Sequence, residues 1–203
     1  MVHLTLHHAS LTDGPESVLV NASNTEVSLG SGVSAAIRRA CGAGFQEHLY
    51  AELARVHGAS MQPGMVLMTH AGGHPRARYV AHVAVMDYRD ASSSSFPTLE
   101  SVRVGCQNLW SAVSDLPGGP HSVAMVALGA GVGNLGVTEP TRIACQTLKA
   151  HLANRPLSIR AVAFYAIDLA ELLAAARVLI AEFPEVRHRL SDEVLEGLVA
   201  SPA

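Results

Sequence analysis

Residues 20–42 read VNASNTEVSLGSGVSAAIRRACG, and this stretch decides the fold class of the 203-residue chain. An apolar strand ends here, and two asparagines, Asn21 and Asn24, follow it. Gly30-Ser31-Gly32 then leads directly into a helix predicted over 33–41. Glycine lets the backbone approach a ligand closely, and the first N–H groups of a helix are unpaired donors at the positive end of its dipole. The stretch therefore predicts a phosphate-binding turn between a strand and a helix.

A second glycine-rich loop, GAGVGNLG, occupies residues 129–136. It follows the apolar run 123–128, whose lack of polar alternation suits a strand covered on both faces. Successive small residues let backbone amides form a concave anion-binding nest. Neither loop is a P-loop or a dinucleotide-binding fingerprint, because the Lys-Ser/Thr pair and the distal acidic residue are missing. Either loop alone is compatible with a tight turn that binds nothing, but the two together predict a ligand that contains a diphosphate.

Short apolar runs alternate with helical periodicity along the rest of the chain. This alternation predicts the α/β class, as a three-layer α/β/α sandwich around a mixed, mostly parallel central sheet. The predicted strands are 2–6, 18–20, 65–69, 79–86, 123–128 and 160–167, and the predicted helices are 33–41, 44–57, 99–113, 138–152, 168–183 and 191–200.

Capping residues and breakers set the expected boundaries. Thr138 is expected to be the N-cap of its helix, and Asp168 begins the next helix in a pattern like a capping box. Pro184 is expected to end that helix, and Ser191 to cap a terminal one. The Ser-rich segment 90–97, DASSSSFP, is predicted to be a loop.

Composition narrows the classes of function. The 14 basic and 17 acidic residues give a net charge of −3, which excludes a protein that binds extended nucleic acid through a dense basic face. No apolar run reaches the length that spans a bilayer, and no export signal is visible. The 3 cysteines are odd in number and widely spaced, which predicts a reduced, cytoplasmic protein. Without a spanning run, no membrane partner is expected.

The sequence resembles the macrodomain family. In that family a strand ends in Val-Asn-Ala-Ala-Asn and a Gly-Gly-Gly-Val loop opens a helix, which VNASNTEVSLGSGVSAAIRRACG closely matches. The resemblance continues through 61–85, MQPGMVLMTHAGGHPRARYVAHVAV, and 123–136, VAMVALGAGVGNLG. It implies a macrodomain-like, ADP-ribose-binding domain over 1–183, and it leaves 184–203 as a C-terminal helical extension.

Because macrodomains bind ADP-ribose in a cleft across the top of the sheet, the resemblance also assigns roles to residues. Backbone amides of the first loop would bind the diphosphate from one side, and the second loop would close over it. Asn24 would contact the distal ribose and, in a hydrolytic member, orient water, so it is the candidate catalytic residue. The complete expected ligand-binding set is Ser10, Leu11, Asn24, Gly30, Ser31, Gly32, Val33, Gly129, Ala130, Gly131, Val132, Gly133, Asn134 and Ile167.

Four positions depart from the family pattern. Ser10 stands where the family has an adenine-binding Asp, and Ser34 stands where hydrolytic members have an Asp thought to activate water. Gly133 replaces a loop aromatic, and Ile167 replaces an aromatic that stacks on adenine. Tyr165 lies two residues before Ile167 and is expected to compensate only in part.

The resemblance therefore leaves more than one function open. It implies that the chain binds ADP-ribose or a derivative, and it leaves open whether the chain also hydrolyses ADP-ribosyl esters (mono-ADP-ribosyl protein or O-acetyl-ADP-ribose). The alternatives are a non-catalytic reader of ADP-ribosylated proteins, with the terminal helix as a docking surface, and a diverged binder of nucleotides or RNA ends. No cofactor is implied, and the oligomeric state is not predicted.

The eleven histidines do not predict a metal site. The adjacent rings of His7 and His8 point to opposite faces of a strand, and no Cys or carboxylate lies near His70 and His74 in sequence to complete a ligand set. His82 is expected to be a core or cleft-edge residue with its hydrogen bonds satisfied. Cys41 is expected to be a buried apolar residue rather than a nucleophile.

Overall fold

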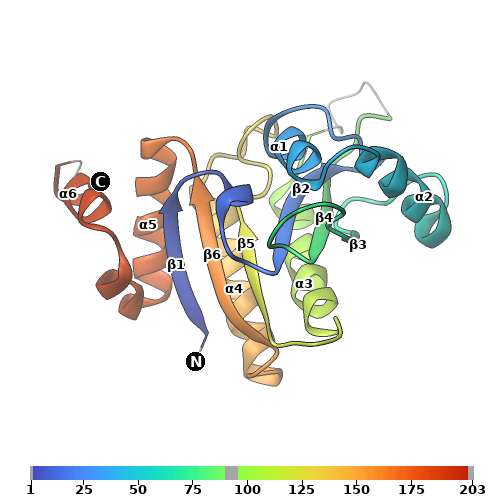
Figure 1. Ribbon diagram of the computed structural model, residues 1–203. Coiled ribbons are helices and arrows are strands. Elements are labelled where there is room, and N and C mark those ends of the chain that lie inside the picture. The colour runs from blue at the N-terminus through green and yellow to red at the C-terminus, as the bar shows by residue number, and fades with distance from the viewer. Residues whose placement is uncertain (1, 90–95, 201–203) are drawn as a thin grey trace.

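A computed structural model describes residues 2–89 and 96–200, so most of the predicted Ser-rich loop lies outside the described residues. One six-stranded sheet with the order β1-β6-β5-β2-β4-β3 forms the centre of the molecule (Figure 1). All neighbouring strands are parallel except β3 and β4, which are antiparallel. The predicted mixed, mostly parallel α/β sheet is therefore confirmed. Within the described residues, no helix is long and apolar enough to cross a membrane.

The strands are β1 (His3–His8), β2 (Val18–Asn24), β3 (Val66–His70), β4 (Tyr79–Met86), β5 (His121–Met125) and β6 (Ile159–Ala166). The helices are α1 (Gly32–Cys41), α2 (Phe45–His57), α3 (Leu99–Ser114), α4 (Thr138–Asn154), α5 (Leu169–Glu182) and α6 (Asp192–Ala200). Two short 3-10 helices, η1 (Leu11–Asp13) and η3 (Pro184–Arg189), complete the described elements.

Two apolar clusters cover the two faces of the sheet. One cluster joins the sheet to α3, α4 and α5, and Trp110 is its largest fully buried side chain. The other joins the opposite face to η1, α1 and α2 through residues such as Ile37 and Leu49. These two layers of helices around one sheet make the predicted three-layer sandwich.

Several local boundaries differ from the sequence prediction. Strand β2 continues to Asn24 because it pairs with β4 along its length, so both asparagines lie within the strand rather than after it. Strand β5 ends at Met125, three residues before the end of the apolar run. Thr138 is the first helical residue of α4 and not its N-cap, a position that Val137 occupies without a side-chain cap. Asp168 and Ser191 do cap α5 and α6, by accepting from the amides of Glu171 and Val194.

The order of the strands creates a topological switch point between β2 and β5. The chain leaves β2 toward β4 and β3 by way of α1 and α2, whereas it leaves β5 toward β6 by way of α4. These connections run in opposite directions, and in open α/β sheets such a switch point is where a crevice forms, outside the carboxyl ends of the two strands. The two glycine-rich loops follow these two neighbouring strands, and the fold therefore brings both loops to that crevice.

The C-terminal segment 184–200 packs against the same core as the rest of the chain. Val186, Leu190 and Val194 belong to the apolar cluster that also contains α5 and β1. Helix α6 lies at the outer edge of the molecule beside α5 (Figure 1).

Candidate functional site

The first glycine loop presents a row of free amides at the N-terminus of α1. Ser31 is the N-cap residue, but its side chain makes no capping hydrogen bond. Within the described residues, the first amide of this segment with a backbone acceptor is that of Ala35, which donates to the Ser31 carbonyl at 3.1 Å. The preceding amides, from Gly30 to Ser34, have no acceptor in the described part of the chain. Unpaired amides at the positive end of a helix dipole are an arrangement that favours an anion.

A strained turn connects β2 to this loop. Val27 has a φ of 53°, which is rare for a β-branched residue, and it is fully buried. The Asn24 side chain holds the turn, because its Oδ1 accepts from the amides of Glu26 and Ser28, both at 3.1 Å, and its Nδ2 donates to the Ser28 carbonyl at 3.0 Å. Asn24 therefore has a structural role in addition to the one predicted, and one of its amide hydrogens keeps no partner among the described residues.

Gln46 supports the same turn from α2. Its Nε2 donates to the Val27 carbonyl at 3.0 Å, and its Oε1 accepts from the Leu29 amide at 2.7 Å. The sequence analysis missed this residue. The available signal was a polar side chain on the apolar stripe of a predicted helix, next to Phe45 and Leu49.

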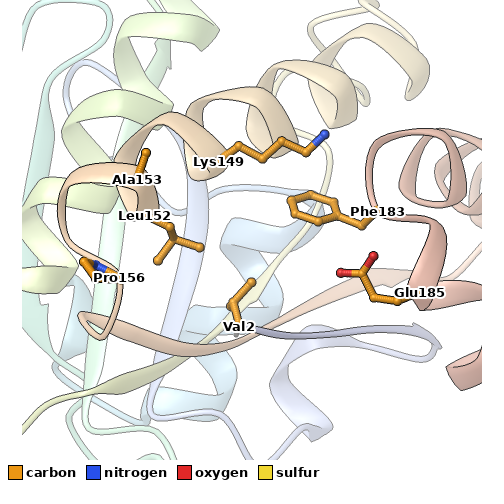
Figure 2. A pocket seen from close by; sticks show the side chains of 7 residues that line it. All are labelled: Val2, Lys149, Leu152, Ala153, Pro156, Phe183 and Glu185. Carbon is orange, nitrogen blue, oxygen red and sulfur yellow. The ribbon is translucent and has the colours of Figure 1, made fainter.

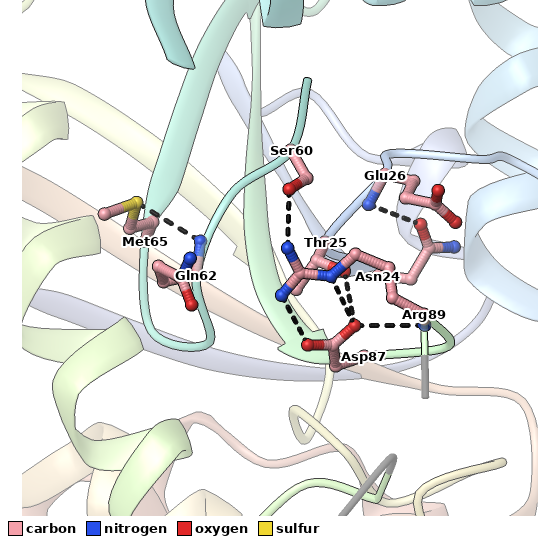
Figure 3. Close-up of polar contacts among 8 residues, drawn as sticks. All are labelled: Asn24, Thr25, Glu26, Ser60, Gln62, Met65, Asp87 and Arg89. Atoms are coloured by element: carbon pink, nitrogen blue, oxygen red, sulfur yellow. Dashed lines mark hydrogen bonds and ion pairs between the residues drawn. The ribbon is translucent and has the colours of Figure 1, made fainter. Parts of the chain in front are cut away.

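A second polar cluster fixes the carboxyl ends of β2 and β4 (Figure 3). Arg89 donates to both oxygens of Asp87, at 2.8 and 2.6 Å, and to Ser60 Oγ at 2.6 Å. Thr25, next to Asn24, donates to Asp87 Oδ1 at 3.0 Å. The hydrogen bonds from Arg89 lower the pKa of Asp87 far below its usual range, so this carboxylate is a poor proton acceptor.

The second glycine loop folds into two successive turns. Gly129 and Asn134 have φ values of 80° and 55°, conformations that glycine and asparagine tolerate. The amides of Ala130, Asn134 and Leu135 donate to carbonyls within or just before the loop. Within the described residues, the amides of Gly131, Val132 and Gly133 have no acceptor. No other described group therefore competes with a ligand for these amides, and Val132 is 65% exposed.

Packing explains why residue 133 is a glycine. A Cβ atom added there would overlap Cγ of Pro97 and lie 2.5 Å from the Gly129 carbonyl oxygen. Pro97 also lies 3.1 Å from the Cβ position of Gly129. The segment before α3 therefore fills the space beside the loop, so that no aromatic side chain fits at residue 133.

We expect Gly133→Phe to destabilise the protein by about 2 kcal/mol, since an overpacked site must displace backbone as well as a proline ring. Urea unfolding of this variant and of Gly131→Ala measures the difference. Gly131→Ala is the control, because a Cβ atom at Gly131 meets nothing within 4 Å. Equal free energies of unfolding for the two variants would contradict the prediction.

A buried chain of hydrogen bonds connects α1 to the far edge of the sheet. Ser34 Oγ donates to Asn21 Oδ1 at 2.8 Å, and Asn21 Nδ2 lies 3.2 Å from His82 Nδ1. His82 Nε2 lies 3.2 Å from Thr69 Oγ1. If the Asn21 amide donates, Nδ1 accepts and Nε2 carries the hydrogen, which is the pattern of a neutral imidazole. Burial lowers the pKa of His82 to about 3, in agreement with this form.

This hydrogen-bond network gives Ser34 a structural role. Its hydroxyl is engaged with Asn21 and lies almost fully inside the protein, and no carboxylate takes part in the network. His82 is a core residue with its hydrogen bonds satisfied, as expected. Asn21, which lies in β2, connects α1 to β4 by its hydrogen bonds to Ser34 and His82.

The residues that were expected to contact the adenine of the ligand lie at the carboxyl ends of β1 and β6. Ser10 Oγ is engaged as the N-cap of η1, where it contacts Thr12 Oγ1 at 2.9 Å. Leu11 is buried, and its amide has no acceptor among the described residues. Ile167 is 79% exposed just after β6.

Tyr165 lies below this surface and does not reach it. Its hydroxyl donates to Glu16 Oε2 at 2.9 Å, and its ring stacks on His7 with centroids 4.9 Å apart. Burial, followed by the contact with Glu16, raises the pKa of the Tyr165 hydroxyl. The residue is therefore part of the core beneath η1 and offers no free ring face.

The two described pockets lie away from the glycine loops. One, of about 330 Å³, is lined by residues such as Val2, Lys149 and Phe183 (Figure 2). The other, of about 360 Å³, includes Thr69 and Tyr79. Val2 precedes β1 and Tyr79 begins β4, so both pockets lie toward the amino ends of the parallel strands, opposite the crevice.

Neither metal binding nor cysteine chemistry is indicated by the described residues. Across residues 2–89 and 96–200, no three His, Cys, Asp or Glu side chains are placed to hold a metal ion. All three cysteines are free and buried. Burial raises the pKa of the Cys41 thiol to about 12, which fits the apolar role expected for it.

The fold and the paired loops define a class of protein: a three-layer α/β domain with two glycine-rich loops at a topological switch point. The chain belongs to the Macro domain family, whose model matches residues 20–144. It is similar to an uncharacterized protein of Mycobacterium tuberculosis, with 30% identity over 171 residues that cover 81% of this chain and 41% of the relative. An uncharacterized protein of Aeropyrum pernix is also 30% identical, over 68% of this chain and 67% of its own length. The chain thus spans about two fifths of the mycobacterial relative.

Solved macrodomain structures share the fold. The Trypanosoma brucei macrodomain in complex with ADP-ribose superposes with a TM-score of 0.72 at 22% identity, over 87% of this chain and 69% of that one. A variant of the Oceanobacillus iheyensis macrodomain with ADPR gives a TM-score of 0.74 at 20% identity, over 88% and 92% of the two chains. These similarities confirm the macrodomain fold predicted from the sequence.

Proposed function

We propose that this protein binds ADP-ribose in the crevice between the two glycine loops, with the diphosphate against their backbone amides. The observation that carries the proposal is the pair of amide rows, Gly30 to Ser34 and Gly131 to Gly133, whose members have no acceptor within the described residues. Backbone amides at a helix N-terminus and in a small-residue nest are suited to an anion with two phosphate groups. The ligands of the Trypanosoma brucei and Oceanobacillus iheyensis macrodomains support the choice of ADP-ribose.

Calorimetric titration with ADP-ribose, and with AMP as control, tests this proposal. We expect micromolar affinity for ADP-ribose and much weaker binding of AMP, because AMP leaves one amide row without a phosphate. Each charge-assisted hydrogen bond that is lost costs about 1.5–3 kcal/mol. A protein that binds no ADP-ribose at millimolar concentration would contradict the proposal.

The geometry supports recognition better than hydrolysis. Ser34 offers a hydroxyl that is already engaged, and Asp87 is a poor base because Arg89 occupies its oxygens. A water molecule in the crevice thus has no described carboxylate of ordinary basicity at these positions. We therefore assign the chain first as a reader of ADP-ribosylated proteins.

Its three buried, unpaired cysteines support the reducing, cytoplasmic compartment predicted from the sequence.

Hydrolysis of an ADP-ribosyl ester is the second candidate, and the free amide hydrogen of Asn24 favours it. That hydrogen can orient a water molecule for attack on the ester carbonyl, with a ligand phosphate as the proton acceptor. The ester bond then breaks, and the ribose oxygen leaves with a proton.

Two substitutions of Asn24 separate these roles. Asn24→Asp keeps the oxygen that accepts from Glu26 and Ser28 but removes both amide hydrogens, the free one and the one donated to the Ser28 carbonyl, whereas Asn24→Ala removes every side-chain contact that supports the turn. For a reader, we expect Asn24→Asp to weaken ADP-ribose binding by about tenfold, through one lost hydrogen bond and the added charge. Calorimetry measures the affinity, and release of ADP-ribose from a mono-ADP-ribosylated protein measures turnover. Wild-type turnover that disappears in Asn24→Asp at saturating substrate would identify a hydrolase instead.

Competition distinguishes the remaining alternative. Displacement of ADP-ribose by short RNA carrying a terminal phosphate, at equal or lower concentration than by ADP, would indicate a binder of RNA ends. The net charge of −3 disfavours that outcome.

A further inference from the structure

The terminal helix α6 is connected to the end of the crevice where the nucleobase is expected. His8, the last residue of β1, has its Nδ1 3.1 Å from Oε1 of Glu193, in the first turn of α6. Its Nε2 lies 3.3 Å from the carbonyl oxygen of Ile167. Buried Val194, beside Glu193, anchors the helix in the core. His8 thus connects Glu193 to the backbone of Ile167, a residue that is 79% exposed.

The contact between His8 and Glu193 leaves one oxygen of the Glu193 carboxylate free to accept a hydrogen bond. A carboxylate and a carbonyl both accept hydrogen bonds, and each ring nitrogen of His8 lies at hydrogen-bond distance from one of them. Glu193 Oε1 is engaged with His8, whereas its Oε2 has no partner within the described residues. The Glu193 side chain is 57% exposed. The carboxylate of Glu193 is therefore one side chain, that of His8, away from the backbone of exposed Ile167.

The order of the strands places this pair at the right end of the crevice. The diphosphate would lie over β5 and β2, and the next strands are β6 and then β1. Because neighbouring strands are about 4.8 Å apart, β1 lies about 10 Å from β5, across one strand. The other expected base contacts offer no free side-chain acceptor, since Ser10 caps η1 and Leu11 and Ile167 are apolar.

We propose that Glu193, held by His8, selects a nucleobase with an exocyclic amino group at position 6, as in adenine. This inference rests on the proposed function, because the diphosphate in the crevice brings the base to Ile167. Glu193 Oε2 accepts a hydrogen bond from the amino group, and Ile167 packs against the ring. The segment 184–200 thereby becomes part of the binding site rather than an appendage.

A comparison of ADP with IDP tests the assignment, because the two differ at position 6 of the base and share the diphosphate. By calorimetry, we expect the wild-type protein to prefer ADP by about tenfold, the effect of one hydrogen bond to a charged group. Glu193→Gln should reduce this preference to about twofold, mainly by weakening ADP. The matched control is Glu196→Gln, which makes the same change on the exposed surface of α6.

A third variant, Asp13→Asn, examines an exposed carboxylate within η1. Loss of the ADP preference in Asp13→Asn but not in Glu193→Gln would overturn the proposal. Equal weakening of ADP and IDP in Glu193→Gln would also overturn it, because that result marks a purely structural role. Binding of ADP-ribose by a wild-type protein without a base preference refutes only this inference, whereas no binding of ADP-ribose or either diphosphate refutes the proposed function too.

Discussion

Gly131→Val is expected to reduce the affinity for ADP-ribose by about a hundredfold while leaving the melting temperature unchanged. A Cβ atom at Gly131 meets nothing within 4 Å, and the residue does not have a positive φ, so the fold accepts a side chain. The same open space is where the proposal places the diphosphate. A branched side chain there holds the ligand away from the amides, with a penalty near the upper end of the roughly 1–3 kcal/mol of overpacking.

Gly30→Val makes the same test from the opposite loop, since a Cβ atom at Gly30 also meets nothing within 4 Å. Gly131→Ala adds only one methyl group and should cause a smaller loss than Gly131→Val. Calorimetry gives the affinities, and thermal unfolding followed by circular dichroism confirms the fold. Wild-type affinity in both valine variants would place the ligand outside this crevice.

Acidification is expected to destabilise the protein through His82. In the folded protein the pKa of His82 is about 3, against an ordinary value of 6.5. Between these two values the unfolded chain binds a proton that the folded protein excludes, so stability is complete above pH 6.5 and falls as the pH decreases toward 3. Each pH unit in this window costs about 1.4 kcal/mol, which amounts to about 3 kcal/mol at pH 4.5.

Urea unfolding at pH 7.5, 6.0 and 4.5 measures this contribution. The matched variant is His82→Gln, because glutamine is uncharged at every pH and carries both a donor and an acceptor for Asn21 and Thr69. We expect the wild-type protein to lose about 3 kcal/mol more than the variant between pH 7.5 and 4.5. Parallel curves for the two proteins would show that His82 is not the buried neutral group of this network.

The sequence predicted the fold class and the two loops because both depend on local patterns. Apolar runs of strand length alternate with helical periodicity, and glycines occur where a strand gives way to a helix. The expected roles of Asn24 and Ser34 were less complete. Asn24 also holds the strained turn at Val27, and Ser34 is bound to Asn21, contacts that come from the conformation of the turn and from the buried position of Ser34.

The sequence by itself therefore determined the approximate strands, most of the helices and the position of each glycine loop along the chain, since the local pattern of apolar residues, glycines and helix breakers encodes these features. Only the tertiary structure decided that β2 and β5 are adjacent, which brings both loops to one crevice. It also decided that Pro97 fills the space beside Gly133, that Ser34, Asn21, His82 and Thr69 form one chain, and that Glu193 reaches His8. Each of these contacts joins residues that are separated in sequence, and the order of the strands and the packing of the layers determine such contacts.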